Sequence, residues 1–358
     1  MPRPDALQAA QRFRVRLAGQ EAEAAERMGR IYASLQAMLT QEIEGLAEQM
    51  ALMDEAQLSK AIQMNRLKLL LGQVEEQAAR FGVVVQAEVS AMQTQALEQG
   101  IADAMALMDA SLPALPPEIH RQVVRAFTRL HPDAIEAMAG LLGPDSPLVE
   151  SLETNFGVAV REQVEKHLLD GITVGQNPCR IARLLTRNVR DSLGNGLTWA
   201  LRTVRTAQLS SYRLASHATY AANPNVVKGW VWHAELGSSR TCMGCIAKHG
   251  TVHPIDETLR DHHNGRCAPI PLTVTYRDLG LNIDEPTEEI EKGEDWFKRQ
   301  PQTMQRQLMG GAMHDAYRAG KFRFGDLSRP YDDPIYGQMW REATLKALLG
   351  EPALKKAA

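Results

Sequence analysis

Apolar positions in the first hundred residues recur at alternating spacings of three and four. The series runs Met28, Ile31, Leu35, Met38, Leu46 and Met53. No proline stands between Asp5 and Asp109. This spacing puts the apolar side chains on one face of a helix. The pattern predicts long antiparallel helices that bury their own stripe, or a short coiled coil that also serves an oligomer. Polar Glu42 and Gln49 interrupt strict heptads.

A proline-rich stretch over residues 113–117 ends this first region. Proline lacks the amide donor and forces the preceding residue out of the helical basin. Beyond this boundary the sequence predicts further helices, separated by turns that contain glycine and proline. The predicted helices cover residues 118–142, 148–169, a segment around 181–189, and 196–222, with a loop over 171–178.

The pattern then changes from helical to extended. Residues 226–233 alternate large apolar with smaller or polar side chains, which is typical of a strand. A short partner strand is predicted over 250–255, and residues 268–272 are expected to be extended. An acidic connector over 285–291 precedes a final helical section that begins at Asp295.

Composition places the chain among ordinary globular proteins. It has 358 residues, of which 44% are hydrophobic and 23% charged, with a formal net charge of -3. This charge gives no global electrostatic reason to expect nucleic-acid binding. No apolar run approaches the ~20 residues that cross a bilayer. The N-terminus lacks the apolar core of a secretory signal, so folding in a reducing cytoplasm is expected.

Three of the four cysteines gather in one short stretch with several histidines. Cys242 and Cys245 are separated by two residues, and His262 and Cys267 follow in a second loop. Two thiolates at this spacing can bind one cation from a tight turn, and an imidazole and a third thiolate can complete a tetrahedron. The sequence therefore predicts a Zn²⁺ site. Four protein ligands leave no position for water, which favours a structural over a catalytic role.

Other interpretations of this stretch remain open at the level of sequence. His263 is the second choice for the imidazole, and His249 and His253 also lie within reach. A disulfide is less favoured, because the chain shows no secretory signal. A thioredoxin-type redox pair is weaker still, because residues 238–241 resemble a turn after a strand rather than the start of a helix in a βαβ unit.

Two stretches of this region resemble enzyme motifs, but the spacing of their residues does not match either motif. His233 and Glu235 before the cysteine pair resemble a zinc deaminase signature, but too few residues intervene. Asp261 and His262 resemble the start of a ββα-metal nuclease, yet no second histidine-bearing segment follows at a suitable distance.

The predicted fold class is mainly α, with long N-terminal helices, a helical middle region and a small zinc-stapled α+β module. The expected domains are a long-helix region over 1–112, a helical middle region over 118–222, the zinc-binding module over 223–284 and a C-terminal helical region over 285–358.

The order of these features resembles the phage minor head protein family, the head-morphogenesis type typified by the F protein of phage Mu. The resemblance rests on an Arg-Thr pair at 205–206, a tryptophan strand at 230–232 and Arg-Thr-Cys-x-x-Cys at 240–245. A Trp-Phe pair at 296–297 and Gly-Lys at 320–321 extend it, so that it covers roughly residues 171–327.

One motif departs from that family. Where the family has His-Pro-Asn-Cys-Arg-Cys, this chain has a histidine at 263 and a glycine at 265. One thiol is thereby lost, and Cys267 is the remaining downstream one, which still leaves a Cys₃His set.

The resemblance implies a virion protein at the portal vertex of the head. It would act in head assembly, genome packaging or delivery by binding the portal protein and other head proteins, with packaged DNA as a further contact. It implies no enzymatic activity. Two alternatives stay open: a zinc-dependent hydrolase or nuclease in which His262 or His263 and Glu235 or Asp261 transfer protons, and a DNA-binding zinc module. The second would use four basic residues, Arg240, Lys248, Arg260 and Arg266.

Overall fold

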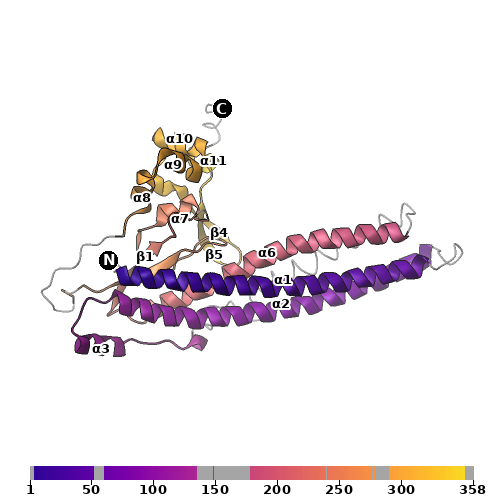
Figure 1. The fold of residues 1–358 in the computed structure, drawn as a ribbon, viewed down its shortest axis with the longest axis horizontal. Coiled ribbons are helices and arrows are strands. Elements are labelled where there is room, and N and C mark those ends of the chain that lie inside the picture. The colour runs from indigo at the N-terminus through magenta and orange to yellow at the C-terminus, as the bar shows by residue number, and fades with distance from the viewer. Residues whose placement is uncertain are drawn as a thin grey trace. The chain divides into compact units, whose positions relative to one another are not determined.

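The computed structural model describes residues 4–51, 60–134, 148, 178–238, 240–275, 277–278 and 290–350. These residues are mainly helical, with a three-stranded sheet and a separate two-stranded hairpin (Figure 1). The mainly helical fold class is therefore confirmed. The chain forms two compact units, one made of residues 1–18, 93–139 and 206–358 and the other of residues 19–92 and 140–205. In the described part of the chain, no helix is both long and apolar enough to span a bilayer.

The second unit contains most of α1 (Pro4–Ala51) and the first part of α2 (Lys60–Ser111). Ion pairs join Arg27 to Glu88 and Glu21 to Arg205, so α1 contacts both α2 and α6 here. The buried stripe of α1 consists of Met28, Tyr32, Leu35, Leu39 and Ile43.

This stripe differs in part from the predicted one. Met28 and Leu35 are buried as expected, but Met38 is 41% exposed and Leu39 is buried in its place. Over several turns, 3.6 residues per turn move the buried position forward by one residue. The side chain of Leu46 and all of Met53 lie outside the described residues.

The last part of the long helix α6 (Pro178–Ala221), residues 206–221, belongs to the first unit, and its Tyr220 donates to the carbonyl oxygen of Pro269 in the sheet. The sequence predicts two helices with an interruption near residue 195, and this prediction is wrong, because one helix runs through. Each glycine costs a helix interior only ~1 kcal/mol, which packing of the surrounding turns readily offsets. The predicted loop at 171–178 and helix at 148–169 lie almost entirely outside the described residues.

The helix after the proline-rich stretch is shorter than predicted. α3 (Pro117–Arg125) begins as expected but ends at Arg125 rather than continuing. The following backbone is held by Asn223, whose side-chain oxygen accepts from Thr128 N at 2.7 Å and whose amide donates to Thr128 O at 3.0 Å. Pro132 further disfavours a helical conformation for the residue before it. Residues 135–142 of the predicted helix lie outside the described ones.

The three-stranded sheet has β1 (Val227–His233) at its centre, between β2 (Val252–Pro254) and β3 (Ala268–Thr273). Both neighbours pair antiparallel to β1. The predicted strand and its two extended partners are therefore confirmed. Trp230 and Trp232 of β1 are fully buried and pack with Cys245 and Cys267.

The C-terminal part carries several short helices. They are α7 (Met243–Lys248), α8 (Gly293–Arg299), α9 (Gln302–Met309), α10 (Gly311–Arg318), the 3₁₀ turn η1 (Phe324–Leu327) and α11 (Leu345–Leu349). Met243 and Ile246 of α7 share one apolar core with Phe297, Phe324 and Leu327. The helical start near Asp295 is confirmed. A hairpin of β4 (Ser328–Asp333) and β5 (Gly337–Glu342) was not expected in this region.

Candidate metal centre

The cysteine pair sits at the turn where β1 leads into α7. Cys242 is the N-cap of α7, and its Sγ accepts from the backbone N–H of Cys245 at 3.4 Å. The helical turn therefore brings both thiols to the same side, as a two-residue spacer requires. Cys245 is buried and Cys242 is partly exposed.

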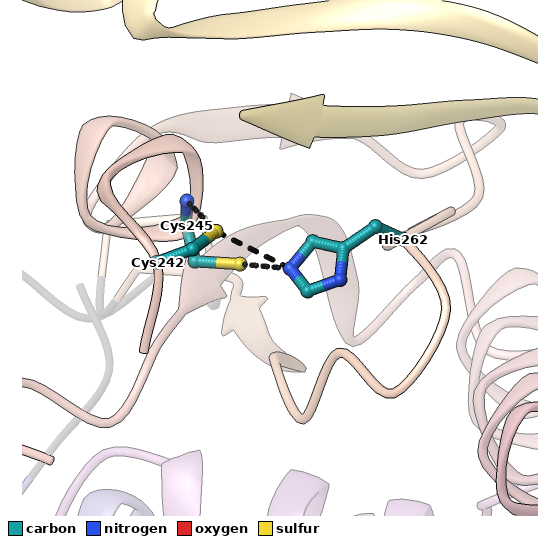
Figure 2. Close-up of side chains that lie close together, drawn as sticks. All are labelled: Cys242, Cys245 and His262. Carbon is teal, nitrogen blue, oxygen red and sulfur yellow. Dashed lines mark hydrogen bonds between the residues drawn. The ribbon is translucent and has the colours of Figure 1, made fainter. Parts of the chain in front are cut away.

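His262 faces the two thiols from the opposite loop (Figure 2). Its Nε2 lies 3.3 Å from Cys242 Sγ and 3.2 Å from Cys245 Sγ. Its Nδ1 lies 2.7 Å from the carbonyl oxygen of His263. With Nδ1 donating to this carbonyl, the neutral ring presents the Nε2 lone pair to the sulfur atoms, which is the arrangement a metal-binding imidazole needs.

Cys267 joins the cluster through Cys245. The donor atoms of Cys242, Cys245 and His262 all lie within 4.8 Å of one another, and so do those of Cys245, Asp261 and Cys267. The structure therefore brings the four predicted residues into two overlapping groups that share Cys245. Both groups can hold a metal ion. Asp261 is the additional member, which the sequence analysis considered as part of a nuclease-like motif and as a proton-transfer residue of the hydrolase alternative, but not as a metal ligand.

Asp261 is a buried carboxylate that organises the second loop. It is 1% exposed and accepts hydrogen bonds from the backbone N–H of His262 at 2.9 Å and of Cys267 at 3.1 Å. Burial by itself would raise the pKa of Asp261, but Arg213 and these donors outweigh it, so the pKa lies below its usual value. The carboxylate is therefore charged and fixes both candidate ligands that flank the loop.

Arg213 of α6 holds the same loop from the other side. Its guanidinium lies 3.3 Å from Asp261 and donates to the carbonyl oxygens of Cys267 at 2.9 Å and Gly265 at 2.7 Å. A buried arginine is unusual and needs such partners to offset its charge. Arg213 is only 4% exposed.

The other histidines have different partners. His263 Nε2 lies 2.7 Å from Asp333 of β4. His249 Nδ1 accepts from Ala234 N at 3.0 Å, and His253 stacks on Trp230 with ring centroids 4.2 Å apart. Among the described residues, none of these three belongs to either candidate metal group. The structure thus favours His262 over the alternatives.

Neighbouring groups shift the pKa values of His262 and Cys242 in this cluster. Burial opposes the charged form of His262, yet Cys242 and Asp261 raise its pKa to about 9. The hydrogen bond with Cys245, together with His262, lowers the pKa of Cys242. This environment favours the thiolate form of Cys242, which is the form that binds a metal ion.

The β4–β5 hairpin covers this turn. The carboxylate of Glu342 accepts from the backbone N–H of Met243 at 3.1 Å, and Lys248 Nζ lies 3.4 Å from the centre of the Trp340 ring. Sequence reasoning missed both residues, since they lie far from the cysteines in the chain and belong to no motif. Only a pairing signal across that distance would have found them.

Fold and site together define a mainly helical protein with a small α+β module built around a cysteine–histidine cluster. The model of the family described as Phage Mu protein F like protein matches residues 162–270. The recognition of a phage head-morphogenesis family is thereby confirmed, and the matched segment contains all four predicted ligands. That family consists of structural head proteins. Comparisons with curated proteins and with solved structures gave no significant match.

Proposed function

We propose that this protein is a minor head protein of a phage, associated with the portal vertex, which acts in head assembly and in packaging or delivery of the genome. It does so by binding the portal protein and other head proteins, and it is not an enzyme. The observation that carries this proposal is the family match over residues 162–270, which spans β1, α7 and the cysteine–histidine cluster.

A structural zinc ion is the second part of the proposal. Cys242, Cys245, His262 and Cys267 would hold it, with Asp261 and Arg213 orienting the loop that carries the last two. Three sulfur donors and one imidazole suit Zn²⁺ and complete its tetrahedron. Bound zinc would staple the turn before α7 to the loop before β3. Structural zinc in small sites contributes ~10–16 kcal/mol of binding free energy, so the module would depend on it.

Particle composition tests the first part. Quantitative mass spectrometry of purified, DNA-filled particles would give the copies of this chain per portal subunit. A low, reproducible ratio is expected for a minor protein at one vertex. Absence from particles at every assembly stage would contradict the proposal. The matched control is a particle preparation from cells in which this chain is deleted.

Metal content tests the second part. Purified protein is expected to contain one zinc per chain, and X-ray absorption should report three sulfur neighbours. Cys242→Ser should lower the zinc content and the incorporation into heads. Ser238→Ala, a change of similar size in the preceding turn, should do neither. Normal incorporation of a zinc-free variant into heads would show that the assembly role does not require zinc.

The same measurement excludes or supports the hydrolase alternative. A catalytic site needs an open coordination position and an available proton acceptor. Asp261 is held by Arg213, Cys245 and the backbone N–H groups of His262 and Cys267, whereas Glu235 is exposed. Two sulfur neighbours plus a water in the absorption spectrum would favour catalysis over a structural role.

A further inference from the structure

A cavity of about 330 Å³ lies beside the cysteine cluster. The N-terminal part of α1 forms one wall, and the two loops that carry the candidate metal ligands form the other. Small-molecule sites have volumes of ~300–1,000 Å³, so this cavity is large enough for a small ligand. Cys245, His262 and Cys267 also line the cavity, so it opens directly onto the candidate metal site, and α1 closes its other side.

Arginines dominate the charge of this cavity. Arg14, Arg240 and Arg266 line it, and Glu235 is the one carboxylate in the lining. With zinc bound, three thiolates and one dication would add a single negative charge. The arginines therefore outnumber the negative charges by three to two. The cavity therefore carries a net excess of one positive charge, which favours an anion.

Arg14 has an unmet hydrogen-bonding need at this place. Its Nη2 lies 2.6 Å from Nδ1 of His233, whereas its Nε is buried with no hydrogen-bond partner among the described residues. A buried donor without an acceptor is costly, and more so on a charged group. Burial also lowers the pKa of Arg14. An anion in the cavity, which other atoms of Arg14 line, would offer this guanidinium a compensating charge.

The arginines are not part of a general basic surface. Of the four basic residues that the sequence places near the cysteines, Lys248 packs on Trp340 and Arg260 donates to the carbonyl oxygen of Tyr336 at 3.2 Å. Arg240 and Arg266 line the cavity. Two of the four basic residues therefore line the cavity, together with Arg14, which lies more than two hundred positions away in the chain.

We propose that this cavity binds a phosphate group. The guanidinium fork binds phosphate and carboxylate oxygens in pairs, and several forks around one cavity match a group with three or more oxygens and up to two charges. A carboxylate would engage fewer of the donors. The phosphate has two chemical sources: a free or mononucleotide phosphate, and the backbone of a nucleic-acid strand. This site goes beyond the proposed head-assembly role and does not depend on it.

Calorimetric titration of the full-length, zinc-replete protein tests this proposal. The probes are inorganic phosphate, a 5′-deoxymononucleotide, a single-stranded oligodeoxynucleotide without terminal phosphates, and an oligoglutamate peptide. Arg14→Gln and Arg240→Gln should each weaken phosphate binding about tenfold, because each removes a charge-assisted hydrogen bond. Glu235→Gln should strengthen it. Arg12→Gln is the matched control, since Arg12 is exposed on α1 and lies outside the cavity lining.

The results of these titrations distinguish a small phosphate ligand from a nucleic-acid backbone. Binding of phosphate or mononucleotide that is lost in the two variants supports the proposal with a small ligand. Oligonucleotide binding with the same sensitivity supports it with a nucleic-acid backbone. Tighter binding of oligoglutamate than of any phosphate would overturn it, as would no binding at all or an equal loss in Arg12→Gln. Arg14 also contacts His233, so loss of binding in Arg14→Gln can reflect misfolding. Arg240 is exposed, so the Arg240→Gln variant tests the proposal independently of that contact.

Discussion

The paired helices of residues 19–92 and the cysteine loops are stabilised in opposite ways. In the described part of these helices, apolar side chains at helical spacing are buried along one stripe, and many of them contribute to its stability. In the loops, a few buried polar contacts hold an irregular backbone: Asp261, Arg213 and the backbone groups that they engage. Stability is spread over many residues in the first region and concentrated in a few in the second.

This difference predicts how each region fails. A stripe that loses one side chain keeps its neighbours, so the cost depends on the cavity left behind. A polar network that loses one member leaves a buried charge without a partner, which is costlier than the lost contact itself. The substitutions below test the contrast.

The largest effect is expected for Arg213→Met. It would leave the Asp261 carboxylate buried and uncompensated, so the free energy of unfolding should fall by ~3–5 kcal/mol. Denaturant unfolding followed by tryptophan fluorescence would measure it. Arg202→Met, on the exposed face of the same helix, should cost less than about 0.5 kcal/mol. Equal effects of the two variants would show that the loop does not depend on Arg213.

Leu35→Ala tests the apolar stripe. Leu35 is 1% exposed, so its truncation should cost ~2–5 kcal/mol through lost burial and a residual cavity. Met38→Ala is the control on the same helix, because Met38 is 41% exposed and should cost under ~0.5 kcal/mol. Circular dichroism during urea unfolding distinguishes them. A larger loss at Met38 would mean that the stripe follows the heptad spacing rather than the observed one.

Gly265→Ala should have an intermediate effect. A Cβ atom at this residue would overlap with the carboxylate of Asp261, which has little room to move. Displacement of that carboxylate should cost ~1–3 kcal/mol, the range for overpacked interiors. Gly325→Ala is the control, since its Cβ would meet no atom within 4 Å. Thermal unfolding of both variants would measure the difference, and an unchanged midpoint for Gly265→Ala would contradict the tight packing of this loop.

The last effect is absent at neutral pH and concerns acid stability. His217 is buried, its Nε2 accepts from Leu259 N at 2.8 Å, and burial lowers its pKa to about 3. Below pH ~6.5 the unfolded chain binds a proton that the folded chain does not, so stability is lost as the pH falls, by up to ~1.4 kcal/mol per pH unit. His217→Gln should make this decline shallower. The exposed His131→Gln should leave it unchanged, and an equal change in both would remove His217 as the cause.

The sequence predicts what depends on local pattern. Helical spacing identified α1 and α2, alternation identified β1, and the two-residue spacer identified the turn that Cys242 caps. It could not predict partners distant in the chain. The cysteine loops are contacted by Arg213, Asp333 and Glu342, which lie far from them in the sequence. These contacts arise from the tertiary fold, and no local sequence pattern predicts them. The continuous α6 was missed for a related reason, since packing outweighs a local preference of glycine.

The covering hairpin also sets an order of events during synthesis. Glu342 leaves the ribosome one hundred residues after Cys242, which at ~5–20 residues per second is a delay of roughly 5–20 s. Until then the thiols have no cover from β4 and β5. In the proposed zinc-bound form, the metal can therefore bind before the hairpin folds. A chelator present during synthesis should then compete for zinc more effectively than one added to the finished protein.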